Sequence, residues 1–144
     1  MARFRQDMKV AALKRSPLFA GLSRRQLVEV ARLTDDLEEP AGTVLCEEGS
    51  RGREFFVITD GEAVVTRGGK RLATLGEGDF FGEIAVLEPV RRTATVTAAT
   101  SLRFFIVSDR AFNAVLETDP TIERKVLRTL ARRLLSQSGD PTLL

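Results

Sequence analysis

Residues 76–96 of the chain read GEGDFFGEIAVLEPVRRTATV, and this stretch decides the fold. Glycines at 78 and 82 allow the backbone to turn and to approach a ligand closely. We predict a single helical turn over 82–87, because the free N–H groups at the start of a helix form an anion site. An arginine follows at 91 or 92, before a new strand, and its guanidinium can make paired contacts to a phosphate. The stretch therefore predicts a phosphate-binding loop.

The glutamate in this turn, Glu83, indicates that the ligand is more than a phosphate. A carboxylate beside phosphate-binding amides would repel a bare phosphate, since both are negative. The same carboxylate can accept a hydrogen bond from a hydroxyl group. Amides, an arginine and a glutamate in one loop therefore suggest a sugar phosphate with a free hydroxyl.

The composition argues against catalysis and metal binding. The 144 residues include no histidine and one cysteine, Cys46, which we expect to be a small buried apolar side chain. Without histidine, the usual zinc and non-haem iron sites, the histidine-activated nucleophiles and the commonest general base are absent. We therefore expect a protein that is not an enzyme, with no catalytic residue, no metal and no cofactor.

Charge and hydropathy give expectations about location and partners. The net charge of +2 is too small to indicate direct binding to nucleic acid or to a membrane. No apolar run approaches the roughly 20 residues of a membrane span, and the first residues are too polar for a signal peptide. We expect a cytoplasmic protein.

The pattern along the chain predicts one domain over residues 1–138. A helical element is expected at 1–36, a strand-rich region at 37–107 and C-terminal helices at 108–136, followed by a tail at 139–144. Many short β-prone runs punctuated by glycine favour an antiparallel β jelly-roll barrel. The predicted fold class is therefore mainly β with flanking helices.

Local signals predict where individual elements begin and end. Ser23 and Gln26 form a capping-box pattern before a helix whose apolar stripe runs to Leu33. Residues 67–70, Arg-Gly-Gly-Lys, indicate a hairpin turn.

The C-terminal helices carry similar signals. Ser108 can cap one helix, and Asp119 with Pro120 fits the N-cap and first residue of the last helix. Apolar residues then recur at four-residue spacing, at Ile122, Val126, Leu130 and Leu134. This stripe predicts core packing or a dimer seam.

The stretch at 76–96 resembles the phosphate-binding cassette of cyclic-nucleotide-binding domains, as in catabolite activator protein, kinase regulatory subunits and cyclic-nucleotide-gated channels. Residues 81–85, Phe-Gly-Glu-Ile-Ala, are similar to the family's Phe-Gly-Glu-Leu-Ala. Residues 92–96, Arg-Thr-Ala-Thr-Val, are similar to its Arg-Ser/Ala/Thr-Ala-Thr-Val. The resemblance covers nearly the whole chain and implies a jelly roll whose C-terminal helices act as hinge and lid.

By this resemblance, Glu83 would accept the ribose 2′-hydroxyl and Arg92 would pair with the cyclic phosphate. The nine-residue interval between them matches the kinase-type cassette, and counting back from residues 94–96 assigns the role to Arg92 rather than Arg91. The ligand-binding residues implied are Gly82, Glu83, Ile84, Ala85, Arg92, Thr93 and Ala94.

Two positions depart from the family pattern. The family commonly has Gly-x-Pro-Arg before its key strand, whereas here the proline is shifted to Pro89 and the glycine is missing. Arg53 stands where an acidic residue often holds the cassette arginine, and Glu54 is the candidate to replace it.

The backbone amides of Ala85 and of Thr93 or Ala94 would complete the phosphate cradle. In the family, a threonine at the position of Thr93 accompanies a preference for cyclic GMP, although many bacterial members with serine or threonine there take cyclic AMP. We expect cyclic AMP, with cyclic GMP as the alternative.

The resemblance implies a regulatory sensor that responds to its nucleotide through movement of the C-terminal helices. A protein effector, or a second copy bound through the C-terminal helix, would receive the signal. Two alternatives remain, a ligand-free scaffold for protein contacts and the sensor part of a longer transcription regulator.

Overall fold

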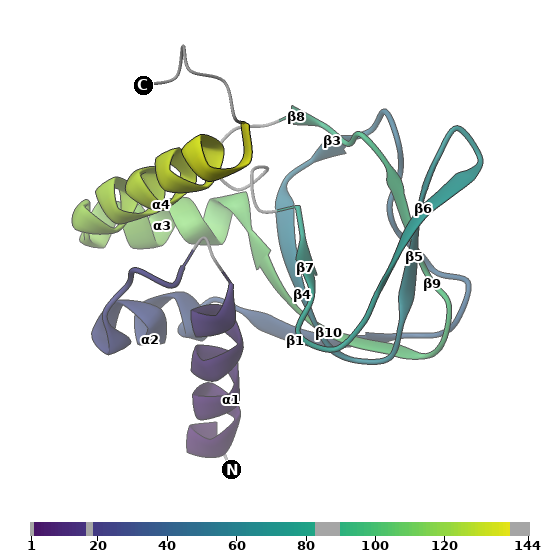
Figure 1. The fold of residues 1–144 in the computed structure, drawn as a ribbon. Coiled ribbons are helices and arrows are strands. Elements are labelled where there is room, and N and C mark those ends of the chain that lie inside the picture. The colour runs from purple at the N-terminus through teal and green to yellow at the C-terminus, as the bar shows by residue number, and fades with distance from the viewer. Residues whose placement is uncertain (1, 17–18, 83–89, 139–144) are drawn as a thin grey trace.

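The structure is a computed structural model that describes residues 2–16, 19–82 and 90–138. Its helices are α1 (Ala2–Arg15), α2 (Arg24–Arg32), α3 (Asp109–Thr118) and α4 (Thr121–Ser138). Figure 1 shows these helices gathered on one side of the strands. None of the helices in the described ranges combines the length and apolarity that crossing a lipid bilayer requires.

The strands of the described ranges form two four-stranded antiparallel sheets and a two-stranded ribbon. The first sheet, in the order β1-β10-β4-β7, contains β1 (Asp35–Glu39), β10 (Leu102–Ser108), β4 (Glu54–Asp60) and β7 (Phe80–Phe81). The second, in the order β2-β9-β5-β6, contains β2 (Val44–Cys46), β9 (Thr95–Ala98), β5 (Ala63–Arg67) and β6 (Lys70–Leu75). The ribbon pairs β3 (Arg51–Gly52) with β8 (Val90–Arg91).

The predicted fold class, mainly β with flanking helices, is confirmed. The helices lie against the first sheet, and the second sheet lies on the far side of it (Figure 1). The pairing of the described strands gives two facing sheets and a ribbon rather than one continuous closed barrel.

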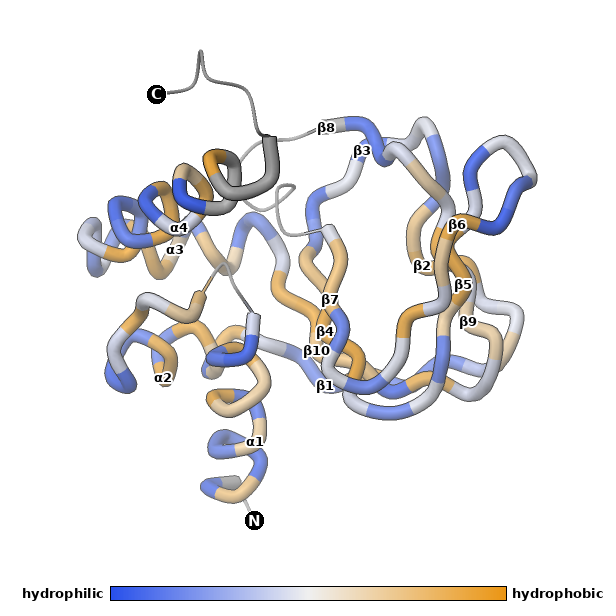
Figure 2. Tube along the Cα trace, in the orientation of Figure 1, coloured by the Kyte–Doolittle hydropathy of each residue, from blue (hydrophilic) through white to orange (hydrophobic). Residues whose placement is uncertain are grey.

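Strand β4 separates two hydrophobic cores. Phe55 and Val57 pack with apolar side chains of the helical layer. Phe56 and Ile58 belong to the other core, between the two sheets. Because successive side chains of a strand point to opposite faces, burial on both faces requires an unbroken apolar run, and residues 55–58 supply it. Figure 2 shows this apolar run along β4, with β10 beside it.

The helical core is built on aromatic contacts and on the inner face of α4. Phe19 makes edge-to-face contacts with Phe55, at 5.3 Å between ring centroids, and with Phe112, at 5.6 Å. Ile122 and Val126 are fully buried and Leu130 packs against the same cluster, so this part of the predicted apolar stripe belongs to the core, whereas the side chain of Leu134 lies outside the described residues.

The hairpin predicted at residues 67–70 is present between β5 and β6. Gly68 and Gly69 have φ values of 56° and 79°. Two consecutive residues with positive φ form the tight turn whose twist matches antiparallel strands, and glycine adopts this conformation without steric cost.

A polar junction joins α2 to the start of α4. The capping box of Ser23 and Gln26 is formed as predicted. The buried side-chain amide of Gln26 also donates to Asp119 Oδ2 (3.0 Å) and to Thr121 Oγ1 (2.9 Å). Lys125 Nζ donates to Gln26 Oε1 at 2.7 Å. One glutamine therefore ties the N-terminal helices to the last helix.

Two boundary predictions need correction. Helix α4 begins at Thr121, one residue after the predicted Pro120, and Asp119 Oδ1 accepts a hydrogen bond from the Thr121 N–H at 3.1 Å. Leu33, predicted on the buried stripe of its helix, is the C-cap of α2 and is 41% exposed. The chain turns away from the helical core there, toward β1.

Candidate phosphate-binding site

Arg92 is held in place first by its backbone. It directly follows the ribbon strand β8, which pairs with β3. The Arg92 N–H donates to the carbonyl of Ser50 at 2.7 Å, and the Arg92 carbonyl accepts from the N–H of Gly49 at 2.8 Å. Both bonds continue the pairing of the ribbon, so the direction in which the side chain leaves the backbone is fixed.

The guanidinium of Arg92 is nearly buried, with 9% of the side chain exposed. Its Nη2 donates to the backbone carbonyl of Glu54 at 2.9 Å and lies 3.4 Å from the carboxylate Oε2 of the same residue. The centre of the guanidinium lies 6.0 Å from the ring centroid of Phe56, within the range of a cation–π contact. Glu54 thus supports the arginine, as expected from the sequence for a chain with Arg53 in the usual acidic position.

Two glycines from different segments, Gly52 in β3 and Gly82 just after β7, enclose the guanidinium. A Cβ on Gly52 of β3 would lie 2.0 Å from Arg92 Nε and 2.2 Å from Cζ. A Cβ on Gly82, which has a φ of +81°, would lie 2.6 Å from Arg92 Nη1 and 2.6 Å from the Glu54 carbonyl oxygen. A side chain at either position would displace the guanidinium. The role of Gly52 was not foreseen, because only its distance from Arg92 in space reveals it.

Cys46 lies in the charge environment of this arginine. The residue is 6% exposed, and burial raises the pKa of its thiol to about 11; the Arg92 charge acts to lower it and the Glu54 charge acts to raise it. At neutral pH the thiol is therefore protonated and behaves as a small apolar group, in keeping with the sequence.

The predicted site residues fall into two groups. Gly82 and Arg92 are in contact range, and Thr93 and Ala94 follow Arg92 directly along the chain. Thr93 is exposed and its carbonyl accepts from Arg67 Nε at 2.8 Å, whereas Ala94 is half-buried. The remaining predicted residues, Glu83, Ile84 and Ala85, lie outside the described residues, as does the shifted Pro89.

Arg91, which the sequence placed outside the site, has a different environment from Arg92. It is exposed, and its Nη1 donates to the carbonyl of Gly49 at 2.8 Å. Adjacent arginines therefore have different burial and different partners.

The geometry of Arg92 suits it to anion binding. One end of the guanidinium, Nη2, is occupied by Glu54, while Nη1 lies next to Gly82, at the start of the glycine-glutamate motif. Water screens the charge of a nearly buried guanidinium less than that of a solvated one, while the Glu54 carboxylate 3.4 Å from Nη2 offsets part of it. The described part of the site is therefore an arginine of fixed orientation, paired at one end with Glu54.

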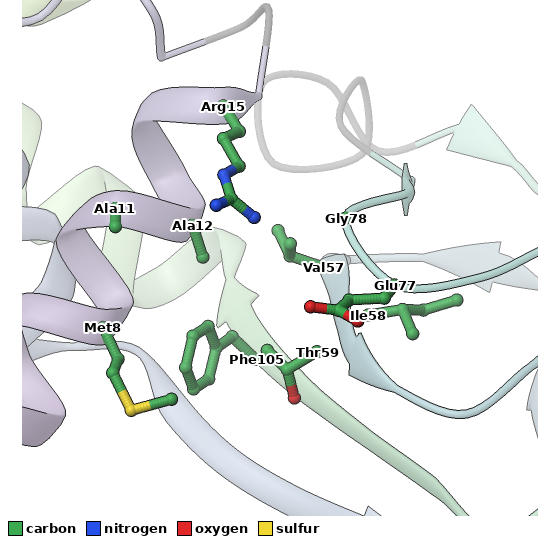
Figure 3. Close-up of a pocket in the computed structure, with 10 residues that line it drawn as sticks. All are labelled: Met8, Ala11, Ala12, Arg15, Val57, Ile58, Thr59, Glu77, Gly78 and Phe105. Atoms are coloured by element: carbon green, nitrogen blue, oxygen red, sulfur yellow. The ribbon is translucent and has the colours of Figure 1, made fainter.

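A separate cavity of about 220 Å³ lies between α1 and the first sheet. Figure 3 shows Arg15 of α1 and Glu77 of the loop after β6 on its walls, with Met8 and Phe105 among its apolar lining. None of the predicted site residues in the described ranges lines this cavity. It is distinct from the environment of Arg92.

Comparison with known proteins gives matches over most of the chain. A family model described as a cyclic nucleotide-binding domain matches residues 37–119. The chain is 37% identical over 128 residues to a cAMP-dependent protein kinase regulatory subunit of Yarrowia lipolytica, with 81% of this chain covered. The match spans about a third, 34%, of that relative's length.

Solved structures are similar as well. The N-terminal domain of a transcriptional regulator from Streptomyces coelicolor A3(2) superposes with a TM-score of 0.81 at 30% identity, covering 88% of this chain and 94% of that one. The regulatory domain of Toxoplasma gondii PKA, crystallised with cAMP, superposes with a TM-score of 0.71 at 28% identity, covering 78% of this chain and 44% of that one.

Proposed function

The chain belongs to the cyclic nucleotide-binding domain family, and on this premise we propose that it binds a cyclic purine nucleotide and acts as a regulatory sensor without catalysis of its own. The observation that carries the proposal is the arginine described above. Arg92 is nearly buried, held by Glu54 and enclosed by Gly52 and Gly82, and it lies within the range that the family model matches.

The proposed ligand contacts follow the chemistry of a cyclic nucleotide. Arg92 pairs with the cyclic phosphate, and Glu83 accepts the ribose 2′-hydroxyl. The amides of Ala85 and of Thr93 or Ala94 complete the cradle, with Gly82 and Ile84 as its other members. A charge-assisted guanidinium–phosphate hydrogen bond is among the stronger hydrogen bonds in proteins, and Nη1 is the end of Arg92 that Glu54 does not occupy.

We propose cyclic AMP as the ligand, with cyclic GMP as the alternative. The name of the similar kinase subunit and the cAMP in the similar solved structure support this choice. Thr93 bears on the choice, because its hydroxyl is the group that can reach the amino group of guanine. Its exposed side chain is available for such a contact.

The proposed output is a movement of the C-terminal helices, within a single domain over residues 1–138. Bound phosphate would favour one arrangement of the glycine-glutamate loop, and α3 and α4 would shift with it. Such a shift requires that the nucleotide bind the two arrangements with different affinity. A movement of α4 would have to break or remake the hydrogen bonds of the polar junction, from Gln26 to Asp119 and from Lys125 to Gln26. A protein effector, or a second copy through α4, would read the change in the cytoplasm.

Titration calorimetry of the purified chain with cyclic AMP and with cyclic GMP tests the proposal. We expect saturable binding of one equivalent, tighter for cyclic AMP. At ~100 μM nucleotide, binding with a free energy of roughly −5 kcal/mol or stronger is detectable. If neither nucleotide binds at this concentration, the sensor proposal is overturned and the scaffold alternative is favoured.

A second candidate is the sensor part of a longer transcription regulator. The similarity to the N-terminal domain of the Streptomyces regulator favours it, because nearly the whole of that domain is covered. The natural reading frame beyond Leu144 decides this, since a DNA-binding segment must follow the sensor in such a regulator.

A further inference from the structure

Helix α4 has an outer apolar stripe that the core does not use. Ile122 and Val126 are fully buried on its inner face. Leu127 and Leu135, by contrast, are 54% and 47% exposed, and Ala131 between them is exposed as well. Four-residue spacing places these three side chains along one side of the helix. The helix therefore presents two apolar faces, one of which meets solvent.

Charges border the outer stripe unequally. At about 100° per residue, Arg128 and Arg132 run along one edge and Arg124 lies among the apolar residues, whereas Glu123 lies at the opposite edge. The three arginines are exposed, and none takes part in an ion pair formed within the described ranges. A shallow hollow of about 510 Å³ follows the same surface and is lined by Pro120, Glu123, Arg124, Leu127, Arg128 and Ala131.

We propose that this outer face of α4 docks an acidic amphipathic helix of a partner protein. Leucines at four-residue spacing on the partner would cover the stripe, and aspartate or glutamate along one of its edges would meet the arginines. The unequal borders orient the partner, because its carboxylates must face Arg128 and Arg132 while a neutral or basic residue faces Glu123. The inference gives the effector of the proposed sensor a chemical class and therefore rests on that function.

Two other occupants fit the charges less well. In an antiparallel pair of α4 helices related by a twofold axis, the edge with Arg128 and Arg132 would face its own copy, and like charges repel. In a parallel pair that edge would face the edge with Glu123, but one glutamate per copy leaves most of the three arginines without a carboxylate partner. An anionic lipid surface favours helices with basic residues on both borders of the apolar face, but Glu123 occupies one border here. A protein helix with a single acidic edge satisfies both borders.

Binding of a designed peptide to the chain, measured in the absence of nucleotide, tests the docking proposal. A labelled synthetic helix of ~18 residues, with leucines at four-residue spacing and glutamates along one edge, is titrated with the full chain by fluorescence anisotropy. A scrambled peptide of the same composition is the first control. The chain variants are Leu127→Ser and the double change Arg124→Glu with Arg128→Glu.

Matched variants elsewhere separate a docking face from general charge attraction. Leu72→Ser changes a leucine that is 52% exposed on β6, and the double change Arg25→Glu with Arg71→Glu alters the same net charge at two other exposed sites. Thermal melting by circular dichroism shows whether every variant is folded.

We expect the designed peptide to bind the wild-type chain at least about tenfold more tightly than the scrambled peptide does. Each α4 variant should lower the affinity for the designed peptide at least about tenfold. The matched variants should change that affinity by less than about twofold. Equal binding of the scramble, or equal loss in the matched variants, overturns the proposal. Binding to phosphatidylglycerol vesicles in place of the peptide assigns the face to lipid and overturns it too. A dimer that is seen by sedimentation velocity and abolished by Leu127→Ser assigns the face to a second copy of the chain and likewise overturns the proposal. Because the peptide assay contains no nucleotide, its failure is distinct from failure of the nucleotide titration.

Discussion

Arg92 Nη2 donates to the backbone carbonyl of Glu54 at 2.9 Å, a shorter contact than the 3.4 Å to the carboxylate of the same residue. The first support of the arginine is therefore a main-chain group that substitution does not remove. Replacing the Glu54 side chain would leave this bond in place, and the position of the guanidinium depends more on the path of β4 than on the carboxylate.

Replacement of Arg92 by alanine should cost at least ~2 kcal/mol of nucleotide binding, because it removes a charge-assisted contact to the phosphate. Calorimetric titration of the variant measures the loss. Arg91→Ala is the control, since that neighbouring arginine is exposed and directed to the Gly49 carbonyl. Equal affinities for the wild-type chain and the Arg92 variant would remove Arg92 from the site.

The substitution Gly52→Ala should weaken nucleotide binding by roughly tenfold or more, equivalent to about 1.4 kcal/mol. The new Cβ would lie 2.0 Å from Arg92 Nε, so the guanidinium must move. Gly76→Ala is the matched control, because a Cβ there meets nothing within 4 Å. The same titration compares the two variants, and an unchanged affinity of the Gly52 variant would show that the ligand does not depend on this arginine position.

Removal of the Gln26 side chain by alanine substitution should lower the free energy of unfolding by ~1–3 kcal/mol. The substitution breaks the hydrogen bonds to Asp119 and Thr121 and leaves Lys125 without its acceptor. Urea unfolding measures the change, and Arg25→Ala, at an exposed position of the same helix, should alter stability by less than ~0.5 kcal/mol. Similar losses in both variants would show that the junction contributes nothing specific.

Stability should fall in acid partly through Asp119. The Thr121 hydroxyl, followed by the Gln26 amide, holds the pKa of Asp119 below its ordinary value of 3.8. A carboxyl whose pKa is lower in the folded state stabilises the fold above the unfolded pKa, and that stabilisation is lost as pH falls through the folded value. Asp119→Asn should therefore flatten the stability profile below about pH 4. Parallel profiles for the variant and the wild-type chain, from urea unfolding at several pH values, would contradict this.

Local chemistry made much of the fold predictable. The capping box at Ser23, the glycine turn at 68–69 and the unbroken apolar run of β4 each depend on residues close together in sequence. The β-strand propensity of the residues gave the wrong boundary for β1, because Asp35 and Asp36 are poor strand formers. They nevertheless pair with Ile106 and Phe105 of β10, so tertiary pairing extends the strand beyond the region predicted.

The motif of the candidate site and one supporting residue, Glu54, can be identified in the sequence, whereas contacts between distant segments cannot. The spacing from Glu83 to Arg92 is visible in the sequence, and so is Glu54 as a replacement for the missing acidic partner. The fit of Gly52 against Arg92 and the bond from Gln26 to Asp119, 93 residues away, depend on how distant segments meet in space. A single sequence carries no signal for such pairs.

The two cores lie on opposite faces of the single strand β4. Phe56, on one side, lies under the arginine proposed to hold the phosphate, and Phe55, the preceding residue, touches Phe19 of the helical layer on the other. A single peptide bond joins these positions. Neither core can be repacked alone, because any shift of the strand that suits one side is imposed at once on the other. Substitutions at Phe55 and Phe56 should therefore have non-additive effects on the free energy of unfolding.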